Sequence, residues 1–71
     1  MSDKFNVTAR VSNMRFWAEG GNKPLSLGEA YKVGLAQQKF YQDRGMQAEV
    51  EVLFLKDNGQ LGDRIALFIA E

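Results

Sequence analysis

The chain has 71 residues and lacks two residue types on which much enzyme chemistry depends, because it contains no cysteine and no histidine. Without cysteine it can form no disulfide, no thiolate nucleophile and no cysteine-based zinc site. Without histidine it lacks the commonest general base and the commonest metal ligand. We therefore expect no catalytic residues, no bound metal and no cofactor.

Long apolar runs and an excess of one charge sign are also absent. The longest apolar run covers residues 65–70, which is far shorter than a membrane span. The first six residues lack the apolar core of a signal peptide. Nine Lys and Arg residues balance nine Asp and Glu residues, so the net charge alone implies neither nucleic acid nor a membrane as partner. These features predict a cytoplasmic protein that does not bind membranes.

The composition is typical of one small globular domain. Apolar residues make up 45% of the chain and charged residues 25%, which is ordinary for a folded protein and wrong for a disordered one. At this length only about 60% of the unfolded surface can be buried, which leaves no room for a second domain or a deep cleft. We expect a single domain over residues 1–71.

Residues 5–18 alternate between apolar and polar side chains, with a change of parity in the middle. The first apolar set indicates a half-buried strand over residues 5–11, and apolar side chains then resume at residues 14, 16 and 18. A two-residue turn at Ser12 and Asn13 would bring both sets to one face, which predicts a hairpin. One long strand with a bulge at the parity change is the alternative.

Clear end signals indicate a helix between residues 26 and 45. Ser26 and Glu29 form the S-x-x-E capping box at its start. Gly45 is the expected residue just beyond its end. Ala30 and Gly34 are small residues near the middle of the apolar arc. Close approach of the helix to a sheet is the usual reason for such residues.

Two apolar segments, residues 48–55 and 64–69, flank Asn58-Gly59, the strongest short hairpin signal. A tight turn there would place Val50 opposite Leu67. Two additional residues before the second segment also allow a three-residue loop with a bulge, which would shift the pairing by one residue. Both registers remain open from the sequence.

The predicted order is therefore β-β-α-β-β, an α+β fold with a four-stranded antiparallel sheet and one helix on one face. If residues 5–18 form one bent strand, the order becomes β-α-β-β. In either case the second face of the sheet has no helix to cover it, and such open faces are usually polar.

The open face is expected to carry side chains that indicate binding. By alternation it holds Thr8, Arg10, Arg15 and Trp17 from the first hairpin, and Glu49, Glu51, Leu53 and Phe68 from the second. Large exposed apolar side chains usually mark an interface. We therefore predict an interaction surface that consists of Arg10, Arg15, Trp17, Leu53 and Phe68.

Three interpretations of this face compete. A protein partner, or a second copy of the chain, explains aromatic side chains beside a rim of mixed charge and is favoured. A single-stranded nucleic acid could stack on Trp17 and place phosphates on Arg10 and Arg15, although Glu49 and Glu51 on the same face oppose it. In the third, Trp17 only caps the edge of the core, and the protein is a structural dimer without a ligand.

Charge is unevenly divided along the chain. Residues 1–44 hold seven Lys and Arg and four Asp and Glu, a net of +3, whereas residues 45–71 hold two and five, a net of −3. Hairpins lying side by side would give the sheet a basic half and an acidic half. Such a surface suits the antiparallel pairing of two copies, so we expect a homodimer through the sheet face. Ordinary solvation of exposed charges is the alternative.

Three short motifs suggest chemistry without meeting its requirements. Glu49 and Glu51 lie about 6–7 Å apart on one strand, but a flat face offers no pocket to activate them. Residues 20–23 precede a helix, as phosphate-binding loops do, without the P-loop spacing. Asp57 and Asp63 lack the spacing of a calcium loop. We expect none of these motifs to form a site.

The order of the local signals resembles that of short phage-encoded accessory proteins, among them inhibitors of host RNA polymerase and some anti-CRISPR proteins. The resemblance spans a strand, a loop, Ser-Leu-x-x-Ala at a helix start (Ser26, Leu27, Ala30), a glycine-ended helix (Gly45) and a following strand. It implies a mode of action in which a small protein without catalytic residues occupies the surface of a partner and inhibits or modulates it.

Overall fold

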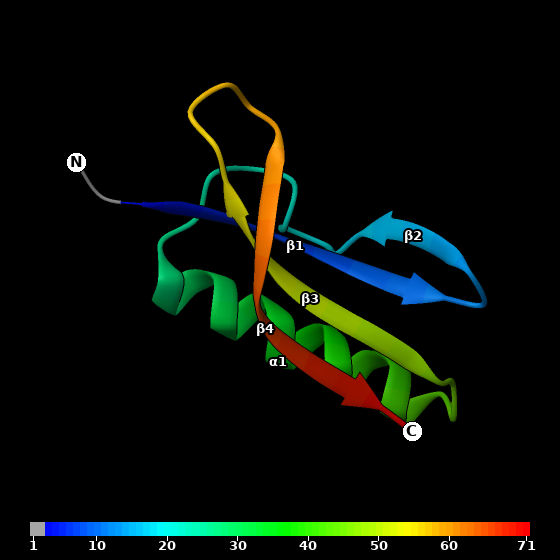
Figure 1. Cartoon of the computed structure of the whole chain (residues 1–71). Helices are drawn as coiled ribbons and strands as arrows, with labels where there is room; N and C mark the ends of the chain where they lie inside the picture. The colour runs from blue at the N-terminus through cyan, green and yellow to red at the C-terminus, as the bar shows by residue number, and fades with distance from the viewer. Residues whose placement is uncertain (1–2) are drawn as a thin grey trace.

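A computed structural model describes residues 3–71 and shows one helix packed on one face of a four-stranded antiparallel sheet (Figure 1). The elements are β1 (Lys4–Val11), β2 (Met14–Trp17), α1 (Leu27–Asp43), β3 (Ala48–Leu55) and β4 (Leu61–Ala70). The strands lie in the order β2-β1-β3-β4. The predicted α+β fold and its β-β-α-β-β order are confirmed. Within residues 3–71, no helix combines the length and the apolar character that crossing a membrane requires.

The first hairpin closes through the two-residue turn expected from the parity change. Val11 is paired with Met14, and the turn residues Ser12 and Asn13 have φ angles of 49° and 69°. Positive φ at both central residues is the mark of a type I′ turn, which matches the twist of the two strands that it joins. The alternative of one long bent strand is therefore wrong.

The loop that follows β2 is anchored along the outer side of β1. Phe5 and Leu25 exchange main-chain hydrogen bonds of 2.9 and 3.0 Å. The buried side-chain amide of Asn6 donates to the carbonyl oxygens of Gly21 and Lys23, at 3.0 and 2.9 Å. The loop thus takes the place beside β1 that β2 leaves when it ends at Trp17.

Both helix ends have the caps that the sequence indicates. The Ser26 hydroxyl accepts a hydrogen bond from the Glu29 N–H at 3.2 Å, and the Ser26 N–H donates to the Glu29 carboxylate at 3.0 Å. At the other end Gly45 has a φ of +66° and donates to the Gln42 carbonyl at 3.0 Å. These caps satisfy main-chain groups that a helix leaves unpaired at its ends.

The second hairpin does not adopt the tight-turn register but the one that is shifted by one residue. Its closing hydrogen bond runs from the Lys56 N–H to the Gln60 carbonyl at 2.9 Å, which leaves a three-residue loop with Gly59 at a φ of +84°. This loop alone would place Val50 opposite Ala66. The ladder contains irregularities on either side of Leu53, and at each of them β4 has one more residue than β3. The net result is that Val50 lies opposite Phe68 instead of Leu67.

This register places Phe68 on the helix side of the sheet, so the expectation that Phe68 lies on the open face is wrong. A Cβ atom on Gly34 of α1 would come within 2.6 Å of the Phe68 ring. The Tyr31 ring meets the same ring edge-on, with 5.7 Å between centroids. The physical reason is parity, because a shift of one residue turns every following side chain to the opposite face.

The core lies between α1 and the central strands. Its buried members are Phe5, Val7, Ala9, Ala18, Leu25, Ala30, Val50 and Val52. The helix packs across β1, β3 and β4, and Figure 1 shows it running beneath them with β2 at the far edge. All four residues of β2 remain exposed.

The close approach of α1 to Phe68 makes Gly34 sensitive to substitution. We expect Gly34→Ala to lower the free energy of unfolding, because overpacking costs about 1–3 kcal/mol and exceeds the gain of about 1 kcal/mol that alanine brings to a helix interior. Gly28→Ala is the matched control, since nothing lies within 4 Å of its added Cβ and stability should rise. Urea unfolding followed by circular dichroism checks both. Equal stabilisation by the two substitutions would contradict this packing.

The capping box makes helix stability depend on acid pH. The hydrogen bond from the Ser26 main chain, aided by that with the Ser26 side chain, holds the pKa of Glu29 below its ordinary value of 4.5. The stabilisation is present above that value and is lost as pH falls through the lowered pKa of the folded state. Thermal unfolding at several pH values should show the destabilisation by Glu29→Ala shrinking on acidification. The difference between Glu29→Gln and Glu29→Ala should not change with pH, because neither side chain titrates.

Candidate interaction surface

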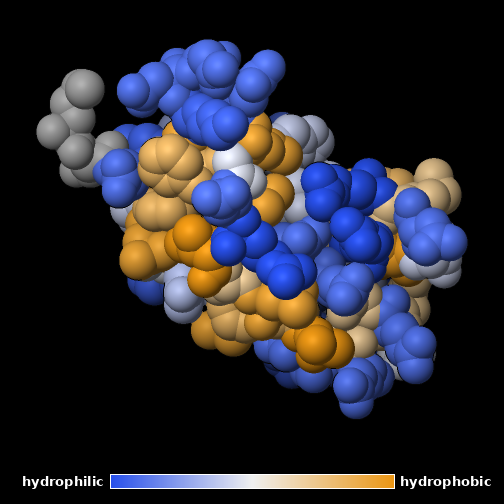
Figure 2. Space-filling view, in the orientation of Figure 1, coloured by the Kyte–Doolittle hydropathy of each residue, from blue (hydrophilic) through white to orange (hydrophobic). Residues whose placement is uncertain are grey.

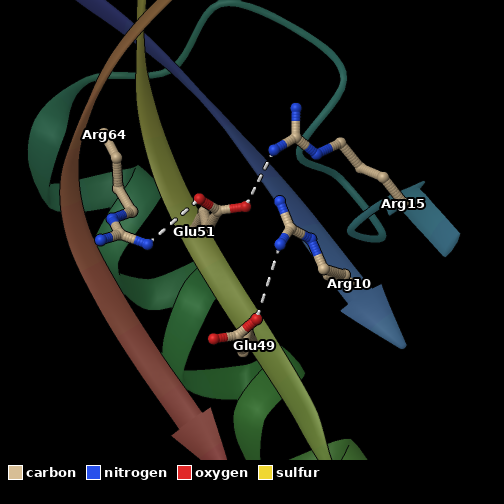
Figure 3. A network of polar contacts seen from close by, with 5 residues as sticks. All are labelled: Arg10, Arg15, Glu49, Glu51 and Arg64. Carbon is tan, nitrogen blue, oxygen red and sulfur yellow. Dashed lines mark hydrogen bonds and ion pairs between the residues drawn. The ribbon is translucent and has the colours of Figure 1, made fainter. Parts of the chain in front are cut away.

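The open face carries a network of ion pairs that joins the two hairpins (Figure 3). Pairing of β1 with β3 places Arg10 directly opposite Glu49, and their charged groups lie 3.9 Å apart. The Glu51 carboxylate lies between two guanidinium groups, with Arg15 at 3.2 Å and Arg64 at 3.5 Å. In Figure 3 these two arginines approach Glu51 from opposite sides, one from β2 and one from β4.

This network accounts for much of the charge asymmetry seen in the sequence. The basic first hairpin and the acidic second hairpin lie side by side, as expected, but their charges meet within one chain. The Glu51 side chain is only 8% exposed, while those of Arg15 and Arg64 are 45% and 50% exposed. Arg10 and Arg15 stand opposite each other in the first hairpin, and each has a carboxylate beside it to offset the repulsion.

The two carboxylates of β3 have different surroundings. Glu51 is enclosed by its arginines, whereas Glu49 borders an open hollow of about 380 Å³ at the end of the sheet. Glu51 is not part of the lining of that hollow. The structure therefore does not place the two carboxylates around one cavity. Among residues 3–71 no cluster of acidic side chains has the arrangement of a metal site.

The centre of the open face is buried, although no helix covers it. Leu53 lies on this face, as expected, but is only 5% exposed. Thr8 is 2% exposed, and its hydroxyl has no hydrogen-bond partner among the described residues. Leu61 of β4 shares with Thr8 and Trp17 the lining of a shallow hollow of about 200 Å³. Of the five predicted interface residues, Leu53 is buried and Phe68 is partly buried against the core, while Arg10, Arg15 and Trp17 remain at the surface.

Strand β2 exposes apolar side chains on both faces of the sheet. Met14 and Phe16 project to the helix side and are 60% and 46% exposed, because α1 does not extend over them. Trp17 projects to the open face and is 53% exposed. Alternation alone assigned Met14 and Phe16 to the core face, so they were missed as surface residues. The width of the predicted sheet could have revealed their exposure, since one helix about 10–12 Å across cannot cover four strands spaced about 4.8 Å apart.

Within residues 3–71 the main chain of β2 also has no strand along its outer side, because β2 stands first in the strand order. The Ala18 N–H donates to the Val7 carbonyl at 3.1 Å. Hydrogen-bonded pairs alternate along an antiparallel ladder, so Phe16 and Met14 direct their main-chain groups to β1. Arg15 and Trp17 direct theirs to the free edge. We call Met14–Trp17, with its side chains and this free edge, the β2 edge.

The opposite edge of the sheet, formed by β4, is better protected. The Gln38 side chain of α1 donates a hydrogen bond of 2.8 Å to the Ile69 carbonyl. The irregular pairing with β3 and the charged residues Asp63 and Arg64 interrupt the strand farther along. Bulges, charged residues and covering side chains are the usual means by which proteins block edge pairing. Among the described strands, β2 is therefore the one whose edge is best suited to accept another strand.

The burial of Glu51 predicts that it contributes more to stability than Glu49 does. We expect Glu51→Gln to lower the free energy of unfolding by about 1–3 kcal/mol, because hydrogen bonds to charged groups carry that value and its arginines lose their partner. Glu49→Gln should cost less than about 1 kcal/mol, since exposed ion pairs contribute little. Urea unfolding of both variants makes the comparison. A larger loss for Glu49→Gln would contradict the role assigned to Glu51.

No protein-family model, no curated protein and no solved structure matches the chain. We therefore base the functional assignment on the β2 edge and on the charges that surround it.

Proposed function

We propose that the chain is a non-catalytic protein-binding domain that acts by occupying the surface of a partner protein. The observation that carries this proposal is the exposure of every residue in the sequence Met-Arg-Phe-Trp of β2. In keeping with the resemblance to phage accessory proteins, the role would be to inhibit or modulate a partner in the cytoplasm.

The composition of the β2 edge favours a protein as partner. Aromatic residues, methionine and arginine are the residue types enriched at protein interfaces, and tryptophan and arginine are enriched among the residues that dominate binding energy. The three apolar side chains of β2 lie on both faces of one strand, so an incoming strand would meet apolar contacts above and below it. Free main-chain groups at Arg15 and Trp17 supply the hydrogen bonds of strand addition.

Arg15 is held in position before any partner arrives. Its guanidinium contacts the buried Glu51 carboxylate at 3.2 Å, on a strand two positions away across the sheet. A side chain that is already ordered loses less conformational entropy on binding than a free one. The ion-pair network thereby supports the β2 edge without itself being the binding surface.

Single-stranded nucleic acid is the second candidate, and the observation that favours it is the exposed Trp17 ring beside Arg15. Stacking on an aromatic ring next to a cation is the usual arrangement of such sites. The carboxylates weaken this candidate, because phosphates would have to compete with Glu49 and Glu51 for the arginines. We therefore rank it below a protein partner.

Substitutions in β2 should separate binding from folding. We expect Trp17→Ala and Phe16→Lys to reduce retention of a specific partner by about tenfold or more, the effect of removing an interface residue worth 1.4 kcal/mol. The measurement is quantitative mass spectrometry of proteins retained from a source-cell lysate by immobilised chain. Leu35→Lys is the matched control, because Leu35 is 52% exposed but lies on α1. It should retain the partner as the wild type does.

The same lone tryptophan distinguishes the two candidates. Quenching of Trp17 fluorescence by single-stranded oligonucleotides at low salt, lost as salt rises, would favour nucleic acid over protein. Failure to find any retained protein that depends on β2 would contradict the protein-binding proposal. Circular dichroism of each variant checks that the fold is intact.

A further inference from the structure

We propose that the partner of the β2 edge is a second copy of this chain, joined by antiparallel pairing of β2 with β2 around a two-fold axis at Phe16. This inference rests on the proposed function and specifies its occupant. The two four-stranded sheets would become one continuous sheet across the axis. Self-association would thus use the edge of the sheet, whereas the charge pattern of the sequence had suggested its face.

The free main-chain groups restrict how two β2 strands can pair. Only residues whose groups point outward can form hydrogen-bonded pairs, and within β2 these are Arg15 and Trp17. A two-fold axis can then lie at Arg15, at Phe16 or at Trp17. Each position opposes a different set of side chains, so the three registers can be compared directly.

An axis at Arg15 is unfavourable for two reasons. It places Arg15 directly opposite Arg15 of the second copy, and like charges in that position repel. It also requires Trp17 to pair with Asn13, which lies in the turn with a φ of 69° and cannot continue a strand.

An axis at Trp17 fails on a hydrogen bond that is already made. It requires Arg15 to pair with Glu19 of the second copy, through the main-chain groups of both residues. The Glu19 N–H donates to the Gln37 side chain at 3.0 Å, within its own chain. The chain has also left the strand by that residue, since β2 ends at Trp17.

An axis at Phe16 meets neither obstacle. Arg15 pairs with Trp17 of the second copy in both directions, and among residues 3–71 no other strand or loop takes up the main-chain groups required. On the open face Arg15 of one copy lies opposite Trp17 of the other, so the indole ring can pack on the aliphatic part of Arg15 while the guanidinium stays on Glu51 of its own chain. On the other face the two Phe16 side chains oppose each other, at a position where paired side chains approach most closely. This register leaves the contact between Arg15 and Glu51 within each chain.

Cysteine scanning tests the register, because the chain has no cysteine of its own. In the presence of oxidised glutathione, Phe16→Cys should form a disulfide-linked dimer of twice 8.0 kDa. Met14→Cys is the matched control, as Met14 is more exposed and on the same face. Two such cysteines would lie about 13 Å apart along the strands, beyond disulfide reach. We expect Phe16→Cys to cross-link about tenfold faster than Met14→Cys or more, because only the two cysteines at position 16 would lie within disulfide reach.

A second cross-linking experiment tests the hydrogen-bonded pairs of residue 15 with residue 17. Arg15→Cys and Trp17→Cys should each cross-link slowly alone but rapidly when mixed, because residue 15 faces residue 17 of the other copy. Light scattering of the wild type over a concentration series should show the mass rising from 8.0 kDa toward twice that value. Phe16→Lys should suppress the rise, and Leu35→Lys should not.

The outcomes separate this inference from the proposed function. Equal cross-linking of Phe16→Cys and Met14→Cys, with a wild type that stays at 8.0 kDa, would overturn the inference. If substitutions in β2 still abolished retention of a partner protein in that case, the protein-binding proposal would stand, with a strand of a different protein bound to the β2 edge. If no β2-dependent partner were found either, both proposals would fail.

Discussion

A single helix must cover a sheet that is wider than the helix, and most other features of the molecule depend on this mismatch. Four strands at about 4.8 Å spacing span about 14 Å between the axes of the outer strands, against about 10–12 Å for a helix with its side chains. Ala30 and Gly34 bring α1 close to the sheet, where it packs on β1, β3 and β4. The β2 edge is left outside this cover, with apolar side chains on both of its faces. The space-filling view likewise shows apolar side chains reaching the surface between polar groups (Figure 2).

On the face of the sheet opposite the helix, ion-paired side chains take the place of a covering element. Because β1 lies beside β3, Arg10 and Arg15 from the first half of the chain meet glutamates from the second half. Glu51 is nearly fully buried between Arg15 and Arg64, the latter from β4. A buried carboxylate is tolerated only where its charge is compensated. The pairing also orders Arg15 next to Trp17, so one interaction contributes both to the fold and to the shape of the β2 edge.

Local signals predicted most of the fold, and long-range packing decided the rest. The first hairpin and both helix caps depend on residues close in sequence, such as Ser26 with Glu29. The register of the second hairpin does not, because it goes with two irregularities in the β3–β4 ladder and with the packing of Phe68 against Gly34 of the distant helix. Consequently the sequence placed Trp17, Arg10 and Arg15 at the surface correctly but turned Phe68 to the wrong face. It could not show that Leu53 is buried either, since that depends on how the irregular β4 lies over the face.

The contrast between the two sheet edges argues that the exposure of β2 is a functional feature. An unprotected edge with aromatic side chains is a liability for any small protein, and β4 carries protective features that β2 lacks. The shortness of β2 limits unwanted strand pairing, because a four-residue strand offers outward main-chain groups at Arg15 and Trp17 alone. Pairing there can be specific, since moving the two-fold axis by one residue opposes like charges or requires an N–H already bonded to Gln37. Pairing through β2 does not favour an open-ended assembly, because it uses up the β2 edge and the free edge of β4 is better protected.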